Sequence, residues 1–80
     1  MGPVMAEHPE LVRLAKAVRA ARAAAGLTQE DVAFAAGLSV RHFQELESGR
    51  LNPSYLTLAA VAAATGTSVA KLVARADRQR

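Results

Sequence analysis

The chain has 80 residues, a formal net charge of +3, a pI near 10.2 and no cysteine. This length suits one small domain, and a chain without cysteine has neither disulfides nor thiolate metal sites. No apolar run reaches the roughly 20 residues of a membrane-spanning helix and no export signal opens the chain, so we expect a soluble, cytoplasmic protein without a membrane partner.

The N-terminal part is expected to hold a short leader and one long helix. Residues 1–8 are predicted to form a disordered leader ahead of a single domain over residues 9–78. Pro9 suits the first turn of a helix, and Gly26 marks the helix end. Apolar residues recur between them at helical spacing and are expected to face the core: Leu11, Leu14, Ala15, Val18, Ala21 and Ala25.

A second helix is predicted over residues 29–36, because both of its ends carry the appropriate signals. Thr28 can accept a hydrogen bond from an otherwise unpaired amide at the helix start. Asp31 occupies the reciprocal position of a capping box. Gly37 follows the last helical residue and is of the type that commonly ends a helix.

A third helix is predicted over residues 40–48, with Ser39 as its cap and Gly49 as its stop. The turn between the second and third helices is then only about three to four residues long, as in a helix-turn-helix. That motif points to duplex DNA.

Two further helices complete the predicted all-α fold. The fourth starts after Pro53, is capped by Ser54 and ends at Gly66, and the fifth is capped by Ser68. The residues of these two helices that are expected to face the core are Leu58, Val61, Ala62, Thr65, Val69, Leu72 and Val73. Since no strand signal occurs, we expect a compact five-helix bundle with the second and third helices as the helix-turn-helix.

The two faces of the third helix differ in polarity. At 100° per residue, Phe43, Leu46 and Glu47 lie on one side, and the other side carries Val40, Arg41, Gln44, Glu45 and Ser48. Arg41 can donate two hydrogen bonds to guanine, Gln44 can pair with adenine, and Val40 can contact a thymine methyl group. The second face therefore has the residue types that read base edges in the major groove.

Glu45 leaves three alternatives open, since a carboxylate is repelled by phosphates. It can accept a hydrogen bond from a cytosine amino group, pair with Arg41 one turn back, or point away from the DNA. Simple repulsion would leave the direct readout to Arg41 and Gln44.

These motifs together resemble the repressor-type helix-turn-helix family, which includes the lambdoid phage repressors, the Cro proteins and XRE-like regulators. The resemblance covers residues 17–73 and rests on dispersed elements in the right order: Arg22, Gly26-Leu27-Thr28-Gln29-Glu30, Val32-Ala33, Gly37-Leu38-Ser39, Leu46-Glu47-Ser48-Gly49, Asn52-Pro53-Ser54, Leu58, Ala62, Gly66, Ser68 and Leu72. It implies a repressor-like bundle from a bacterium, phage or plasmid. Such a protein regulates transcription as a homodimer on a palindromic site in double-stranded DNA.

The resemblance also implies roles for individual residues. The base-reading positions match Val40, Arg41, Gln44 and Glu45, and Gln29 matches a phosphate-contacting position. Arg22 and Glu47 match an ion pair that ties the first helix to the third. The dimer surface implied around the last helix consists of Thr67, Val69, Leu72 and Val73.

Further polar residues are candidates for contacts with the DNA backbone: Thr28, His42, Ser48, Arg50 and Asn52. Arg50 and Asn52 follow the third helix and can also be ordinary turn residues, an alternative to which we give less weight, while His42 can instead cover the edge of the core. Since His8 is the only other histidine, His42 has no metal-binding partners, and we expect neither metal nor other cofactor.

Positive charge is concentrated in two segments: Arg13, Lys16, Arg19 and Arg22 in the first helix, and Lys71, Arg75, Arg78 and Arg80 near the C-terminus. Such charge is compatible with nucleic acid, but solvated helix faces have similar compositions. The C-terminal cations are also favoured by the dipole of the last helix.

The sequence shows no arrangement of serine, histidine and acid typical of a catalytic triad and no phosphate-binding glycine loop. We therefore expect no enzyme activity, and no site for a small-molecule ligand is evident. The alternative function is a protein-interaction module, an antitoxin or an assembly adaptor, that uses the same fold. Leu56, at a position that is usually polar in the resembled family, and Leu51 in the loop after the third helix support this alternative. Such residues are more often ordinary surface or dimer-contact residues.

Overall fold

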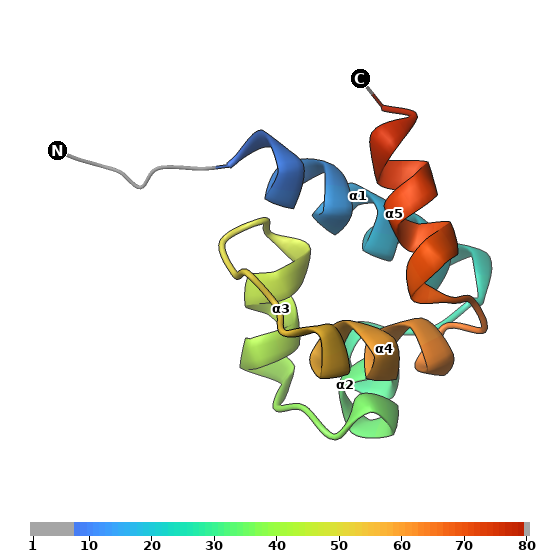
Figure 1. Cartoon of the computed structure of the whole chain (residues 1–80). Coiled ribbons are helices and arrows are strands. Elements are labelled where there is room, and N and C mark those ends of the chain that lie inside the picture. The colour runs from blue at the N-terminus through green and yellow to red at the C-terminus, as the bar shows by residue number, and fades with distance from the viewer. Residues whose placement is uncertain (1–7, 80) are drawn as a thin grey trace, which may run out of the picture.

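Figure 1 shows the helices in the computed structural model, which describes residues 8–79. In chain order they are α1 (Pro9–Ala24), α2 (Gln29–Ala36), α3 (Val40–Glu47), α4 (Tyr55–Ala64) and α5 (Val69–Asp77). No strand occurs within the described range, so the all-α class with α2 and α3 as the helix-turn-helix is confirmed. The predicted leader lies outside this range except for His8, which directly precedes α1.

Side-chain caps fix the starts of four helices. The Thr28 hydroxyl accepts a hydrogen bond from the Asp31 amide at 3.0 Å, and the Asp31 carboxylate accepts one from the Thr28 amide at 2.9 Å. The second bond lowers the pKa of Asp31, because it stabilises the charged carboxylate. Ser39, Ser54 and Ser68 each accept a bond from the amide three residues further on. All four predicted caps are confirmed.

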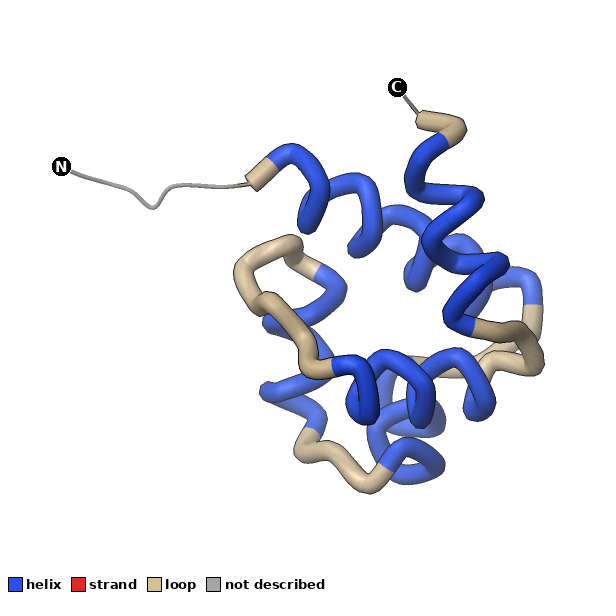
Figure 2. The backbone as a smooth tube through the Cα atoms, in the orientation of Figure 1, coloured by secondary structure: helices blue, strands red, loops and turns tan. Residues whose placement is uncertain are grey.

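The helices form two pairs that α3 joins on one side (Figure 2). α1 packs along α5, α2 packs against α4, and α3 contacts both α1 and α2. Every helix contributes at least one completely enclosed side chain to the shared core: Val18, Val32, Phe43, Leu46, Val61 and Leu72. The position of α3 thus depends on contacts with its neighbours, since a helix of 8 residues is not stable alone in water.

Two of the predicted core residues are wrong. Ala25 is exposed because it follows the last helical residue of α1, and Ala17, which the pattern omitted, is buried instead. Val73 is 43% exposed. The residues of α5 that face the core are Leu72 and Ala76, four positions apart, and Val73 is turned about 100° away from Leu72.

Gly49 ends α3 and lets this end approach α1 closely. Its φ is +79°, a conformation that residues with a Cβ rarely adopt, and its amide donates to the Leu46 carbonyl at 3.2 Å. A Cβ at this position would lie 3.2 Å from the Cα of Val12 in α1. Gly49 therefore satisfies both a backbone and a packing requirement.

We predict that Gly49→Ala destabilises the protein more than Gly66→Ala. Gly66 has a similar φ of +76°, but nothing lies near the place where a Cβ would be. Gly66→Ala should therefore cost only the backbone strain of alanine in this conformation, about 1–2 kcal/mol. Gly49→Ala adds the contact with the Val12 backbone. Urea denaturation of both variants measures the difference, and equal losses of stability would show that the approach of α3 to α1 is not tight.

Candidate nucleic-acid interface

α3 presents a polar face to solvent and an apolar face to the core. Phe43, Leu46 and Glu47 are buried, whereas Arg41 and Gln44 are exposed. The capped start of α3 and the close packing at Gly49 hold the helix at both ends. Its exposed side is therefore presented on a fixed support.

The base-reading candidates differ in how free their side chains are. The Arg41 side chain makes no hydrogen bond or ion pair within residues 8–79, so its guanidinium keeps all of its donors. Val40 is partly buried and packs against the core, which leaves only part of its side chain for a methyl contact. Glu45 is also partly buried and forms no ion pair with Arg41 within that range. Of the three alternatives for Glu45, the pairing with Arg41 is thus not seen.

The buried carboxylate of Glu47 is held by a two-pronged ion pair with Arg22 of α1. Arg22 Nε lies 2.6 Å from Glu47 Oε2, and Arg22 Nη2 lies 3.1 Å from Oε1. The Glu47 side chain is only 3% exposed and that of Arg22 is 19% exposed. The hydrogen bond to Glu47 raises the pKa of Arg22, because it favours the charged guanidinium. This pair joins α1 directly to the end of α3.

Two other arginine contacts extend this link. Arg22 Nη1 donates to the Leu27 carbonyl at 3.0 Å, which fixes the loop between α1 and α2. Arg19 Nη2 donates to the backbone carbonyl of Glu47 at 2.8 Å, so it satisfies an acceptor at the C-terminal end of α3. Sequence reasoning missed the contact of Arg19. The three-residue spacing of Arg19 and Arg22, which places both on one face of α1, was the available signal.

Gln29 connects the buried ion pair to the exposed face of α3. Its Nε2 donates to Glu47 Oε1 at 2.9 Å, and its Oε1 accepts from Gln44 Nε2 at 3.1 Å. Sequence reasoning assigned Gln29 to phosphate and missed both of these bonds. A side-chain amide has two N–H donors, so one N–H of Gln29 remains for an anion.

The candidates for backbone contacts all lie on the surface: Thr28, His42, Ser48, Arg50 and Asn52. Ser48 differs from the others, because its hydroxyl donates to the Glu45 carbonyl at 2.8 Å. A phosphate oxygen only accepts hydrogen bonds, so a contact with Ser48 requires this hydroxyl to turn away from α3.

The residues assigned to a dimer surface do not form one continuous exposed set. Leu72 is 1% exposed and belongs to the core of its own subunit, so it adds no surface and its assignment needs correction. Thr67 and Val69 are partly buried, and Val73 is the most exposed of the four. The reason is again the helical spacing, which turns Leu72 inward and Val73 outward.

Other apolar residues alter the case for a protein-interaction module. Leu51 packs against the core, so it does not provide the exposed contact expected from the sequence. Leu56 is exposed as expected, and Phe34 and Tyr55, which sequence reasoning did not single out, are also largely exposed.

No single described helix is both long and apolar enough to cross a membrane, although the bent pair α4 and α5 passes that test of length and composition when taken together. Within residues 8–79, no group of three or more metal-ligating side chains occurs.

Comparison with known sequences identifies related regulators. Residues 18–72 match the helix-turn-helix family HTH_3. An uncharacterized HTH-type transcriptional regulator of Sinorhizobium fredii, y4dJ, is 44% identical over 52 residues, which are 65% of this chain and 68% of that protein. The HTH-type transcriptional regulator DdrOP3 of Deinococcus deserti is 39% identical over 62 residues, which are 78% of this chain and about half, 48%, of the relative.

Solved structures with the same arrangement of helices are also regulators. The clp gene regulator ClgR from Corynebacterium glutamicum is 36% identical with a TM-score of 0.85, over 91% of this chain and 94% of that one. The restriction-modification controller protein C.AhdI from Aeromonas hydrophila is 31% identical with a TM-score of 0.78, over 81% and 98% of the two chains.

We predict that Arg22 and Glu47 are energetically coupled. Glu47→Ala leaves Arg22 without its counter-charge in a partly buried position and should cost about 3 kcal/mol of stability. The double variant should recover part of this loss, with a coupling energy on the order of 1 kcal/mol. Urea denaturation of the wild type, both single variants and the double variant measures it. Strictly additive losses would contradict the pairing, and Asp77→Ala, which removes an exposed acid of α5 that has no part in the pair, serves as the control.

Proposed function

The chain belongs to the HTH_3 helix-turn-helix family of DNA-binding transcriptional regulators, and we propose that it reads one specific duplex sequence with α3 in the major groove, as a homodimer on a palindromic operator. In this proposal the protein lies in the bacterial cytoplasm, where it binds the DNA of the cell. The proposed function requires neither a cofactor nor a catalytic step.

The observation that carries the proposal is the pair of exposed side chains Arg41 and Gln44 on a helix whose other face is anchored. Arg41 has all of its donors available for the two acceptors of guanine. Gln44 uses one N–H for Gln29, which leaves its second N–H and its carbonyl oxygen for the acceptor and donor of adenine. Because Gln29 holds the Gln44 side chain before binding, Gln44 loses less conformational freedom on DNA, which favours affinity.

Contacts with phosphates would set the position of α3 in the groove. Gln29 and Glu30 are the first residues of α2, and their amides make no hydrogen bond within residues 8–79. Free amides at a helix start suit an anion. Arg50 and Asn52, exposed beyond the end of α3, are placed to contact the backbone as well.

A homodimer is part of the proposal, because one helix-turn-helix reads too few base pairs for selective binding in a genome. Two copies related by a two-fold axis place their recognition helices about 34 Å apart, one turn of the duplex. Val73, with Val69 one turn before it on α5, offers an apolar starting point for the contact. C.AhdI, a controller protein, shares the fold that such an arrangement needs.

A second function is favoured by one observation, the exposure of Phe34, Tyr55 and Leu56. Large contiguous apolar patches mark protein contacts, and these three side chains come from α2 and α4, which pack against each other. A protein-interaction module would bind no preferred DNA sequence. Selection of bound duplexes from a random pool separates the two functions: a palindromic consensus supports the regulator, and an unenriched pool supports the module.

We predict that Arg41→Ala weakens binding to the selected site by about 1–3 kcal/mol and barely changes binding to random DNA. Arg50→Ala, which removes the same charge just beyond α3, should weaken both to a similar extent. Fluorescence anisotropy with the selected and a random duplex measures both variants. Equal losses for Arg41→Ala on the two duplexes would mean that Arg41 contacts a phosphate.

We also predict that Val73→Glu converts the dimer to a monomer, because it introduces a charge into the apolar contact. The side chain is exposed in the subunit, so the fold should tolerate the change. Sedimentation velocity reports the change of mass, and Ala35→Glu, at an exposed position of α2, serves as the control. A Val73→Glu variant that remains dimeric would place the dimer contact elsewhere.

A further inference from the structure

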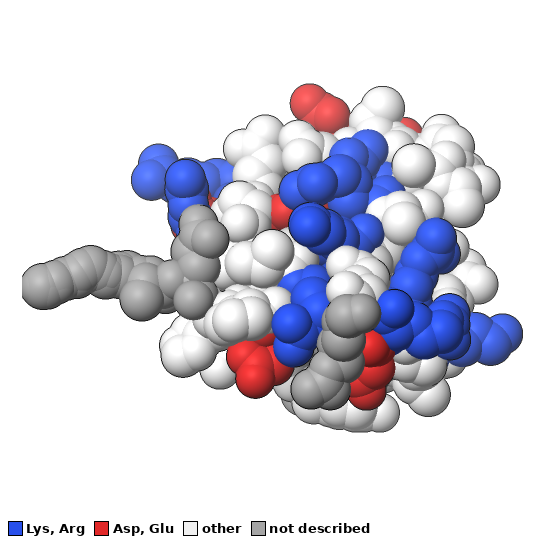
Figure 3. Space-filling view, turned by 90° about the horizontal axis from the view of Figure 1, so that it is seen from above, with Lys and Arg blue, Asp and Glu red and all other residues white. Residues whose placement is uncertain are grey.

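The face formed by α1 and α5 carries positive charge that the proposed DNA contact does not use. Figure 3 looks down on this face and shows Lys and Arg side chains in several groups on it, with a few Asp and Glu side chains among mostly uncharged residues. The exposed cations of α5 are Lys71, Arg75 and Arg78. None of them forms an ion pair with a carboxylate of residues 8–79. Such charge attracts anions.

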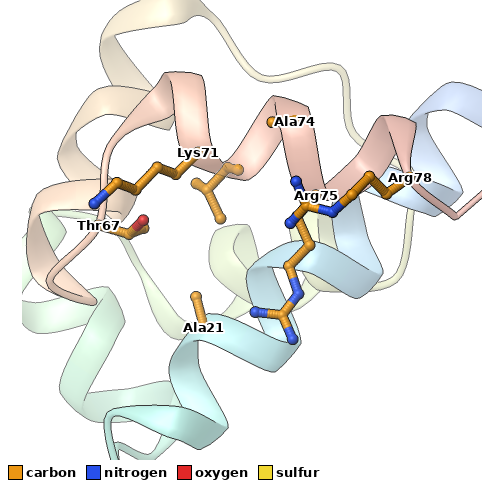
Figure 4. A pocket seen from close by; sticks show the side chains of 7 residues that line it. Ala21, Thr67, Lys71, Ala74, Arg75 and Arg78 are labelled. Atoms are coloured by element: carbon orange, nitrogen blue, oxygen red, sulfur yellow. The ribbon is translucent and has the colours of Figure 1, made fainter.

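These three cations border a hollow between α1 and α5 (Figure 4). It has a volume of about 270 Å³, close to the lower limit of about 300 Å³ for small-molecule sites. The Thr67 hydroxyl lies at the end near Lys71, while Arg75 and Arg78 border the other end. Ala21 of α1 lines it from the opposite side. The hollow therefore combines donors at its rim with apolar surface inside.

The hollow and the proposed dimer contact lie on different flanks of α5. Lys71, Arg75 and Arg78 recur every three or four residues and form one row along the helix. At 100° per residue, Val73 and Asp77 fall on the other flank. A dimer built around Val73 would leave the hollow open, and the Asp77 carboxylate points away from the row of cations.

We propose that this hollow binds a small phosphorylated molecule with an aromatic or apolar body, of the nucleoside diphosphate class. Phosphate oxygens accept charge-assisted hydrogen bonds from Lys and Arg, and the body would pack on the apolar lining. Lys71 and Arg78 are seven residues apart, about 10 Å along the helix, and their long side chains can reach toward a ligand between them. A diphosphate offers these side chains more acceptor oxygens than a single phosphate does. A DNA duplex is too wide to enter a space of this size.

The position of the hollow also connects it to the support of α3, an inference that depends on the proposed DNA-binding function. Ala21 in its lining is followed directly by Arg22, which binds Glu47 at the end of α3. A ligand that bridges α5 and α1 restrains the segment of α1 that carries this ion pair. Because a restrained support leaves less ordering to DNA binding, occupancy should raise affinity for the operator.

Titration of the ¹⁵N-labelled protein with ADP at constant ionic strength tests the ligand site without DNA. We expect saturable amide shifts at Ala21, Thr67 and Ala74, and weaker binding for adenosine and for pyrophosphate alone. Lys71→Gln combined with Arg75→Gln should raise the Kd for ADP at least tenfold. Both residues are exposed, so the amide spectrum of this variant should remain that of a folded protein.

The matched control is Arg41→Gln combined with Arg50→Gln, which removes the same charge near α3 and should leave the Kd for ADP within twofold. Equal weakening in both double variants, or equal binding of adenosine and ADP, would overturn the proposal. Displacement of ADP by a short random duplex with shifts along α5 would assign this face to DNA and would overturn it as well.

A second measurement concerns the link to α3. Anisotropy with the selected operator should show at least threefold tighter binding at saturating ADP in the wild type and no change in the variant of Lys71 and Arg75. Unchanged wild-type affinity would overturn the link but not the ligand site. If the protein selects no DNA sequence at all, the proposed function fails, and the ADP titration still decides the ligand site by itself.

Discussion

The buried carboxylate of Glu47 is the group on which the arrangement of the first three helices depends. Arg22 of α1 contacts both of its oxygens, and Gln29 of α2 donates to one of them. Arg19 adds a bond to the carbonyl of the same residue. One residue at the end of α3 therefore fixes two other helices, with geometry that apolar contacts alone do not specify.

Removing a charge from water is costly, so this arrangement contributes more to geometry than to net stability. A buried ion pair commonly adds little free energy of folding compared with apolar residues of the same size. Here every oxygen of the Glu47 carboxylate has a partner, and the described residues contain no buried side-chain polar atom without one. The small alanine-rich core provides most of the stability, and the ion pair sets the angle at which α3 packs against α1 and α2.

The sequence predicted those features of the fold that depend on local chemistry. Caps such as Thr28 and Ser39 and the short turn between α2 and α3 were predictable, because they depend on backbone groups only a few residues away. The exposure of Val73 and the partial burial of Leu51 were not. The helical spacing separates Val73 from Leu72, but which side of α5 meets the core, and how the loop after α3 packs, depend on the other helices. Gln29 shows the same limit within the site: its position at the start of α2 suggested an anion, whereas its two partners come from a helix 15 and 18 residues further along the chain.

The bond between Gln29 and Gln44 has a consequence for how such a protein can change its operator in evolution. Gln44 is hydrogen-bonded to Gln29, which in turn is hydrogen-bonded to Glu47. A substitution of Gln44 therefore alters internal contacts of the protein together with the base contact proposed for this residue. Arg41 has no partner within the described residues and can be replaced without disturbing them. If α3 binds DNA as proposed, new sequence preferences should arise first at the base pair assigned to Arg41, and changes at Gln44 should require an accompanying substitution at Gln29.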